Sequence, residues 1–195
     1  TGRITVPLSI DTRKAGVARA ALESGAGIIN DISGLRHDAE MIATAIEKSA
    51  AIVVMHMQGS PETMQLNPHY QDTVSEIIDW LDRKTMELIS SKIPPEKIIV
   101  DPGIGFGKRL RDNLDIIEEI GDFHSLGFPV LVGYSRKSFI GTVTGRKPGD
   151  RLWGGFAALG KCLIGGAQII RVHDVKETVD FIKTWKSIER KENYR

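Results

Sequence analysis

The sequence predicts an α/β protein built on a parallel β-sheet, and three observations lead to that fold class. Six short apolar runs of strand character are each followed by a segment with helical periodicity, and strands that alternate with helices form parallel sheets. The runs are continuously apolar, which is typical of strands covered on both faces. Each run also stops at a polar or charged residue. Two architectures fit this pattern, an open doubly wound sheet and a (β/α)₈ barrel.

The predicted strands are short and end where the chain becomes polar. In the clearest case, residues 129–132 lead into Gly133 and Tyr134. Arg136 and Lys137 then exclude a longer strand, because unpaired charge inside a buried strand is too costly. The strands are expected at residues 6–10, 28–29, 51–55, 97–100, 129–132 and 168–170.

The helices are predicted from apolar residues at helical spacing. The strongest case is residues 71–91, where Val74, Ile77 and Leu81 share one face. Residues 60–69, which precede this helix, form a long polar loop of the kind that is often functional. The helices are expected at residues 14–24, 38–48, 71–91, 110–120, 137–140, 150–164 and 177–189.

Length and composition bound the class of protein. A chain of 195 residues without a linker or repeat fits one domain, residues 1–195. The 26 basic and 25 acidic residues nearly balance, which argues against a nucleic-acid or membrane surface as partner. Cys162 is the single cysteine, so no internal disulfide framework is expected and a reducing compartment is favoured. Without a signal peptide or a spanning apolar run, a cytoplasmic protein is expected.

Polar side chains come at or just after the end of every predicted strand. Because the carboxyl ends of parallel strands meet at one edge in both architectures, these side chains are expected to surround a shared site. The residues are Asp11, Asn30, His56, Asp101, Ser135, Lys137, Arg171 and His173.

A simpler interpretation exists for several of these residues taken alone. Asp11, Asn30 and Ser135 could cap the helix that follows, and Lys137 and Arg171 could be solvated surface cations. The shared site is favoured because independent strands deliver polar groups to the same edge.

The mixture of groups predicts a bipolar site. A carboxylate and an amide can bind the edge of a heterocycle with adjacent N–H donors, and a nearby lysine can donate to its carbonyl or ring nitrogen. Arg171 and His173 are cationic groups that suit a phosphate. We therefore expect an aromatic heterocycle at one end and an anion at the other.

Several other motifs are excluded. The segment DPGIGFGK at residues 101–108 has the wrong spacing for a Walker A loop, and Arg109 replaces its Ser/Thr. The segment GYSRK at residues 133–137 lacks the last glycine of a nucleophile elbow. The five histidines show no metal-ligand spacing. Trp153 is expected to open a helix beside the site.

Six segments of the sequence are distinctive in combination, and they run from end to end of the chain. The segments are SIDT (9–12), INDI (29–32), MHMQGSP (55–61), DPGIGFGK (101–108), SRKSFIG (135–141) and RVHDV (171–175). Together they resemble the dihydropteroate synthases, folate-biosynthesis enzymes of the pterin-binding TIM-barrel superfamily. The resemblance implies a (β/α)₈ TIM barrel. It also implies condensation of 6-hydroxymethyl-7,8-dihydropterin diphosphate with 4-aminobenzoate to give 7,8-dihydropteroate and diphosphate.

The resemblance implies where the pterin diphosphate binds. Asp101 and Asn30 would bind the amino-pyrimidinone edge of the pterin, and Asp11 would support its pocket. Arg171 would stack over the pterin and, with His173, bind the diphosphate.

The resemblance also implies an aminobenzoate subsite, which sulfonamide drugs would occupy. Lys137 would contact the pterin and lie near the aminobenzoate, Ser135 would hold the aminobenzoate carboxylate, and Phe106 would pack against its ring. The catalytic residues would be Asp101, Lys137 and Arg171.

One departure from the family pattern affects the expectation. Members of the family begin with two further strands that carry loops of the Asn-Val-Thr-Pro-Asp-Ser-Phe and Gly-Glu-Ser-Thr-Arg-Pro types, and neither loop occurs in these 195 residues. The expectation is therefore six βα units of an eight-unit barrel, in a fragment whose separate activity is open. Mg²⁺ is the expected cofactor, with its asparagine ligand in the first of those loops and no metal ligand in this chain. A homodimer is expected.

Three alternatives stay open. The methyltetrahydrofolate-binding domain of corrinoid methyltransferases shares the pterin barrel, although a methyl donor needs no diphosphate site. A non-catalytic pterin-binding fragment is the second alternative, and a phosphosugar barrel enzyme is the third.

Overall fold

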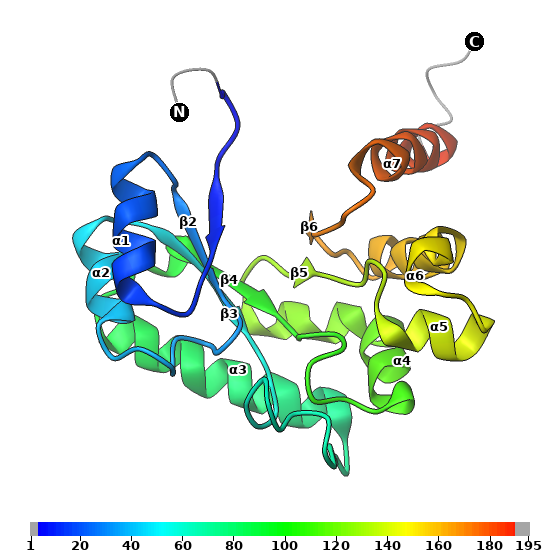
Figure 1. The fold of residues 1–195 in the computed structure, drawn as a ribbon, viewed down its shortest axis with the longest axis horizontal. Helices are drawn as coiled ribbons and strands as arrows, with labels where there is room; N and C mark the ends of the chain where they lie inside the picture. The colour runs from blue at the N-terminus through cyan, green and yellow to red at the C-terminus, as the bar shows by residue number, and fades with distance from the viewer. Residues whose placement is uncertain (1–3, 190–195) are drawn as a thin grey trace.

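The fold consists of six parallel strands, each followed by at least one helix. It is seen in a computed structural model that describes residues 4–189 (Figure 1). The strands are β1 (Ser9–Asp11), β2 (Ile28–Asp31), β3 (Ala51–Met55), β4 (Ile98–Asp101), β5 (Leu131–Val132) and β6 (Ile169–Ile170). All of their pairings are parallel. The alternation predicted from the sequence is confirmed.

The strand order decides between the two architectures. Strands β1 to β4 pair in sequence order, β5 pairs with β6, and a bridge between Val100 and Val130 joins the two sets. A doubly wound sheet reverses its strand order at a switch point, whereas a barrel keeps it. The chain therefore forms six units of a (β/α) barrel.

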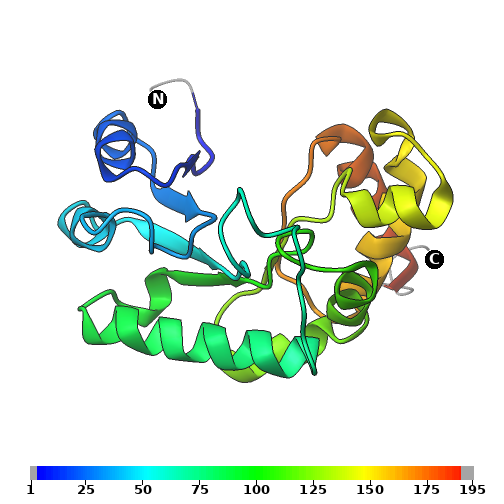
Figure 2. The same ribbon diagram turned by 60° about the horizontal axis from the view of Figure 1, so that its bottom comes forward.

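The helices lie outside the curved sheet (Figures 1 and 2). They are α1 (Ala15–Glu23), α2 (Met41–Glu47), α3 (Thr73–Ser90), α4 (Leu110–Glu118), α5 (Ser138–Thr144), α6 (Leu152–Ile164) and α7 (Val175–Glu189). Three 3₁₀ segments, Pro95–Lys97, Ile120–Leu126 and Pro148–Asp150, complete the connections. Within residues 4–189, none of the helices combines the length and apolar character needed to cross a lipid bilayer.

Residues of one strand alternate between two environments, because successive side chains of a strand point to opposite faces. On β3, Ile52 and Val54 are fully buried in the main core with α3 residues such as Ile77 and Leu81. Val53, between them, lines an inner cavity of about 320 Å³ together with residues of the other five strands. Both faces of the sheet are thus apolar, which explains the continuous apolar runs.

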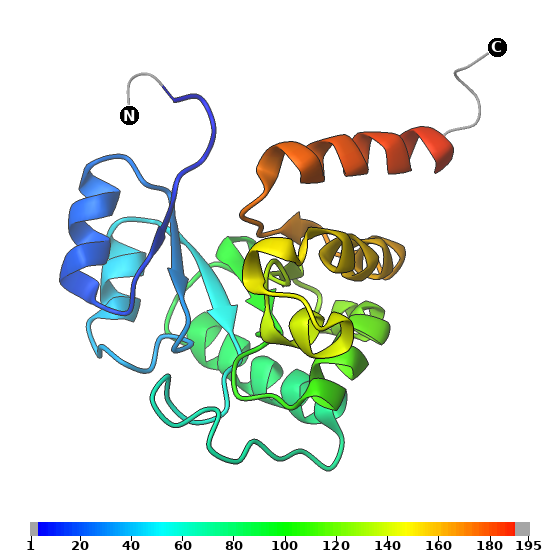
Figure 3. The same cartoon turned by 45° about the vertical axis from the view of Figure 1, so that its right-hand side comes forward.

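Among residues 4–189, β1 and β6 pair with one neighbour each and not with one another. Figure 3 shows the two strands on either side of an opening in the ribbon. At their carboxyl ends an ion pair joins them, because Arg171 Nη2 donates to Asp11 Oδ2 at 2.8 Å.

The predicted boundaries need one systematic correction. Asp11 and Asp101 are the last residues of β1 and β4, and Asn30 lies inside β2, whereas all three were predicted to follow their strands. Their backbones continue the parallel pairing, with Asp11 opposite Asn30 and Met55 opposite Asp101. A polar side chain is tolerated there because it faces the mouth of the barrel. At the other end, β1 starts at Ser9 instead of residue 6, since Pro7 has no N–H to donate.

The remaining boundaries agree to within a few residues. The helix predicted at 110–120 stops at Glu118 and gives way to a 3₁₀ segment. The helix predicted at 150–164 begins at Leu152 after a separate 3₁₀ turn. The loop predicted at residues 60–69 contains no helix or strand.

Candidate active site

Six of the residues predicted for the site line one small cavity at the carboxyl ends of the strands. Its volume is about 60 Å³. The other lining residues are apolar or glycine, namely Ile32, Met55, Gly103, Ile104 and Gly133. The six are Asp11, Asn30, Asp101, Phe106, Lys137 and Arg171. Residues from five different strand ends therefore meet at one place, as the sequence predicted.

A carboxylate bridges the two outermost strands. Asp11 Oδ2 accepts hydrogen bonds from Nδ2 of Asn30 at 3.2 Å and from Nη2 of Arg171 at 2.8 Å. Both Asp11 and Arg171 keep about half of their side-chain surface exposed. Arg171 is thus oriented across the opening, and its guanidinium stays accessible to a ligand.

Asp101 is the buried acid of the site. Its Oδ1 accepts a hydrogen bond from the backbone N–H of Gly103 at 2.7 Å. Burial raises the pKa of Asp101 to about 6, although that N–H group and the charges of Lys137, Lys108 and Arg171 oppose the rise. The carboxyl is therefore ionised at neutral pH and can accept N–H donors from a ring in the cavity.

Lys137 and Phe106 contact each other in the lining of the cavity. Lys137 Nζ lies 3.9 Å from the centroid of the Phe106 ring, which is a cation–π contact. Burial lowers the pKa of Lys137 to about 8, against the opposing effect of Asp101. The ammonium is thus the predominant form at neutral pH and faces both a carboxylate and an aromatic ring.

The turn before Lys137 is held in an unusual conformation. Arg136 has φ of 58°, a left-handed value that is costly for a residue with a Cβ. Arg136 forms an ion pair with Asp174. Arg151 Nη1 donates to the carbonyl oxygens of Arg136 at 3.0 Å and of Lys137 at 3.2 Å. These contacts stabilise the strained turn and fix the direction in which Lys137 leaves it.

Ser135 and His173 lie beside the cavity without lining it. The Ser135 hydroxyl is buried and lies 3.0 Å from His173 Nδ1, and it also accepts the His173 backbone N–H at 3.3 Å. The two residues therefore join the turn after β5 to the turn after β6. The salt-bridge partner of Arg171 is Asp11 and not a group near His173.

The helix-capping interpretation is wrong for all three residues to which it applied. The N-cap of α1 is Lys14, and the hydroxyl that accepts its backbone N–H is that of Thr12. The N-cap of α5 is Lys137, so Ser135 lies two residues too early. Asn30 donates to Asp11 instead of accepting from α2.

Sequence reasoning missed Lys108 as a residue of this site. Its side chain is buried, and Nζ lies 3.1 Å from His56 Nδ1 and 3.0 Å from the carbonyl oxygen of Phe106. Burial lowers the pKa of Lys108 to about 7 and that of His56 to about 2, so the imidazole is neutral. The available signal was a lysine at the end of a glycine-rich segment that had been excluded as a phosphate loop.

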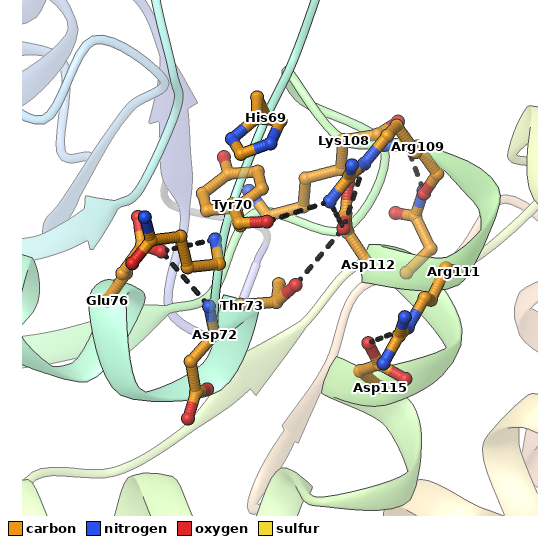
Figure 4. Close-up of polar contacts among 12 residues, drawn as sticks. His69, Tyr70, Asp72, Thr73, Glu76, Lys108, Arg109, Arg111, Asp112 and Asp115 are labelled. Atoms are coloured by element: carbon orange, nitrogen blue, oxygen red, sulfur yellow. Dashed lines mark hydrogen bonds and ion pairs between the residues drawn. The ribbon is translucent and has the colours of Figure 1, made fainter.

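A polar network fixes the start of α4 immediately after Lys108. Figure 4 shows Asp112 at its centre, with Arg109 on one side and Thr73 of α3 on the other. Asp112 accepts from the backbone N–H of Arg109 at 2.6 Å, from Arg109 Nη2 at 2.8 Å and from the Thr73 hydroxyl at 3.1 Å. Arg109 Nη2 also donates to the carbonyl oxygen of Tyr70 at 3.1 Å. The network anchors the loop after β4 to the loop that leads into α3.

Trp153 does not line the cavity. It is the second residue of α6, its side chain is 78 % exposed, and its ring contact is with Phe156 on the same helix. The expectation that Trp153 opens a helix is correct to one residue. Cys162 is fully buried in the core, as expected.

Comparison with a family model gives a match over most of the chain. Residues 1–173 match the family described as "Pterin binding enzyme". Over 188 residues, the chain is 40 % identical to the dihydropteroate synthase of Synechocystis, and the match covers 96 % of this chain and 65 % of that protein. The chain therefore spans slightly less than two thirds of the length of the first curated relatives that it matches.

Solved structures give the same result. The dihydropteroate synthase from Stenotrophomonas maltophilia, with imidazole in its active site, superposes with a TM-score of 0.93 at 41 % identity, over 96 % of this chain and 71 % of that one. Two structures of dihydropteroate synthase from Thermus thermophilus are 39 % identical over 94 % of this chain. The match covers 75 % of the Thermus chain in the complex with 4-aminobenzoate, with a TM-score of 0.88, and 73 % in the complex with 6HMPPP, with a TM-score of 0.89.

Proposed function

This chain belongs to the pterin binding enzyme family, and on that premise we propose that residues 1–195 form the pterin-binding domain of a dihydropteroate synthase. The reaction would join 6-hydroxymethyl-7,8-dihydropterin diphosphate to 4-aminobenzoate and release diphosphate. The relatives at about 40 % identity and the Thermus complexes with 4-aminobenzoate and 6HMPPP support the proposal.

The single observation that carries the proposal is the shared cavity. Asp101 and Asn30 present a carboxylate and an amide at the ends of two strands of one sheet. The amino-pyrimidinone edge of a pterin carries adjacent N–H donors, which these two side chains would bind. Asp11 supports this side through its hydrogen bond from Asn30. An apolar floor that includes Met55 suits the flat ring.

The acids and the cations of the site would act on opposite charges of the reaction, although Asp11 and Arg171 are in direct contact with one another. Breaking the bond between the pterin methylene and the diphosphate oxygen leaves a positive charge spread into the ring, and the carboxylates of Asp101 and Asp11 would stabilise it. The diphosphate takes the bonding electron pair, and Arg171 with His173 would bind the departing anion. The two acids and the two cations therefore act on opposite charges of the same transition state.

The second substrate would enter beside Lys137. The amine of 4-aminobenzoate attacks the methylene carbon and then loses a proton, so no protein nucleophile is needed. Phe106 would pack against the aminobenzoate ring, and Ser135 would hold its carboxylate. The Ser135 hydroxyl already contacts the His173 imidazole, so a hydrogen bond to the aminobenzoate carboxylate would have to replace this contact.

Magnesium stays a prediction of the family resemblance. Within residues 4–189, no group of three or more His, Cys, Asp or Glu side chains is arranged to hold a metal ion. No step above depends on the ion.

Two further properties are proposed with the function. A homodimer is supported by exposed apolar side chains on α6 and α7, including Ile164, Val175 and Ile188, and light scattering would measure the mass in solution. A cytoplasmic location is supported by a single cysteine that is buried.

The three alternative functions differ in the group that is transferred and in whether a pterin binds. A methyltetrahydrofolate-binding domain would transfer a methyl group and would leave Arg171 and His173 without an anion to bind. A phosphosugar enzyme would not bind a pterin at all. A non-catalytic fragment would bind the pterin without turnover.

The test is release of diphosphate from 6-hydroxymethyl-7,8-dihydropterin diphosphate, measured with and without 4-aminobenzoate. Dihydropteroate synthase activity requires release that depends on 4-aminobenzoate and yields dihydropteroate. Pterin binding without release would favour the non-catalytic fragment, and an absence of pterin binding would refute the whole proposal.

A further inference from the structure

Lys108 is a buried amine that the proposed chemical steps do not use. The residue is 4 % exposed, and none of the ion pairs formed within residues 4–189 includes it. Its hydrogen-bonding neighbours are uncharged, namely the imidazole and the carbonyl oxygen of His56 and the carbonyl oxygen of Phe106. A burial of this kind needs an explanation.

Stability alone does not supply that explanation. Burying an ammonium that has no direct ion pair costs free energy, and the nearby charges of Asp101 and Asp112 offset only part of this cost. An apolar side chain of the same length would fill the space without it. The low pKa of Lys108, about 7, reflects the same cost. Groups that break a rule of core packing are typical of functional sites.

The contacts of Lys108 join two loops that follow neighbouring strands. His56 comes directly after β3, and Phe106 lies in the loop after β4. The Lys108 nitrogen lies between them, 3.1 Å from His56 Nδ1 and 3.0 Å from the Phe106 carbonyl oxygen. The His56 ring is itself held, because it packs edge-on against Trp80 at 5.2 Å between centroids. Lys108 therefore ties the Phe106 backbone to a fixed imidazole.

The two loops also touch through their backbones. A Cβ at Gly103 would lie 1.9 Å from the carbonyl oxygen of His56, and one at Gly107 would lie 2.6 Å from that of Gln58. The Tyr70 hydroxyl donates to the carbonyl oxygen of Gly107 at 2.8 Å. Figure 4 shows Lys108 and Tyr70 at this junction. Glycines let the loops approach, and Lys108 supplies a directed bond at the residue whose ring enters the cavity.

We propose that Lys108 is a positioning residue, which holds the Phe106 carbonyl against His56 and so fixes the Phe106 ring beneath Lys137 on the side of the cavity that receives 4-aminobenzoate. The backbones of Asp101 and Asn30, by contrast, are placed by strand pairing rather than by this contact, and Lys108 acts on the Asp101 carboxyl only through its charge. Loss of Lys108 should therefore affect the aminobenzoate more than the pterin. The identity of the ligand rests on the proposed function, whereas the placement of the ring does not.

The experiment has a functional and a spectroscopic readout. Replacing the phenylalanines with 4-fluorophenylalanine introduces six reporters, and Phe106→Leu identifies the fluorine resonance of residue 106. In Lys108→Met this resonance should shift or broaden. The KM for 4-aminobenzoate should rise about tenfold, the effect of losing roughly one hydrogen bond's free energy, while the KM for the pterin diphosphate stays within about threefold.

A second variant and a matched control complete the design. Lys108→Gln keeps a donor but is one atom too short to reach both partners, so it should give the same result. Lys84→Met is the control, since Lys84 is also a buried lysine, 8 % exposed, but it pairs with Glu87 on α3. Lys84→Met should leave the Phe106 resonance and both KM values unchanged.

Several outcomes would overturn the inference. They are an unchanged Phe106 resonance in both Lys108 variants, a proportional rise of the two KM values, and a failure of both variants to fold. If the unmodified protein turns over neither substrate, the proposed function fails, and the fluorine resonance still decides whether Lys108 places Phe106.

Discussion

Replacing Asp101 with asparagine should make the protein more stable and less able to bind a pterin. Asp101 is 6 % exposed, and burial raises its pKa from 3.8 to about 6. One pKa unit corresponds to about 1.4 kcal/mol, so the ionised carboxylate costs the folded state up to about 3 kcal/mol at pH 7. Asparagine has the same shape, keeps the acceptor for the Gly103 N–H and carries no charge.

The pH dependence of this cost has a definite sign. Between the ordinary pKa of 3.8 and the raised pKa of about 6, the folded protein binds a proton at Asp101 that the unfolded chain has released. The free energy of unfolding therefore falls as the pH rises through this window, and the contribution of Asp101 is constant above it. Asp101→Asn should remove this part of the pH dependence.

Ligand binding should change in the opposite direction. In the variant, an amide N–H₂ group would face the N–H donors of the pterin ring, so a charge-assisted hydrogen bond is lost and two donors oppose one another. Such a bond contributes about 1.5–3 kcal/mol, which corresponds to roughly a 10- to 100-fold weaker Kd for the pterin.

Urea denaturation at pH 5 and pH 7, with calorimetric titration of a pterin, measures both effects. Asp112→Asn is the matched control, because Asp112 is also buried. Burial alone would raise the pKa of Asp112, but its ion pair with Arg109 and its hydrogen bonds hold that pKa below the ordinary range. The control variant should lose stability at pH 7. The reasoning is refuted if Asp101→Asn is destabilised like Asp112→Asn, or if it binds the pterin as tightly as the unmodified protein.

Three further predictions follow from the same geometry. Arg171→Ala should lower the rate of diphosphate release by about 10²–10³-fold. The midpoint of urea denaturation should change little, because the ion pair between Arg171 and Asp11 is half-exposed and contributes less than about 1 kcal/mol. A rate within about threefold of the original would contradict this role of Arg171. In the unmodified protein the rate of the proposed reaction should decrease as the pH rises through about 8, where Lys137 loses its proton. A pH–rate profile of Lys137→Met that kept this decrease would exclude Lys137 as its source. Gly103→Ala should destabilise the protein far more than Gly127→Ala in thermal melts, since φ is positive at both glycines but only at Gly103 would the added Cβ meet a backbone atom; equal melting temperatures would show that the loop can move away.

The site could be predicted from the sequence because it depends on strand ends. Asp101, Asn30 and Lys137 lie far apart in the chain, but each comes where an apolar run stops. Parallel strands carry all such residues to the same edge. The strand-end pattern therefore contained the essential information about position, and the resemblance added the roles.

The strand order could not be predicted from the residues alone. Apolar runs covered on both faces occur in doubly wound sheets and in barrels, and the pattern is the same for both. The distinction lies in which strands pair, and the bridge from Val100 to Val130 is a tertiary contact that periodicity does not encode. The resemblance, rather than the pattern, indicated the barrel.

Contacts between loops could not be predicted from the sequence either. Lys108 meets His56 across 52 residues, and Arg171 meets Asp11 across 160. No local spacing links such pairs, because loop geometry decides them. The glycines at 103 and 107 looked like features of a phosphate loop, whereas in the structure they allow two backbones to pack closely.

The most direct test of the central claim is a crystal structure of the protein with bound 6-hydroxymethyl-7,8-dihydropterin diphosphate. The account predicts that the amino-pyrimidinone edge lies within hydrogen-bonding distance of Asp101 and Asn30, with the diphosphate directed toward Arg171 and His173. A pterin bound elsewhere on the molecule, or bound with its diphosphate next to Asp101, would contradict it.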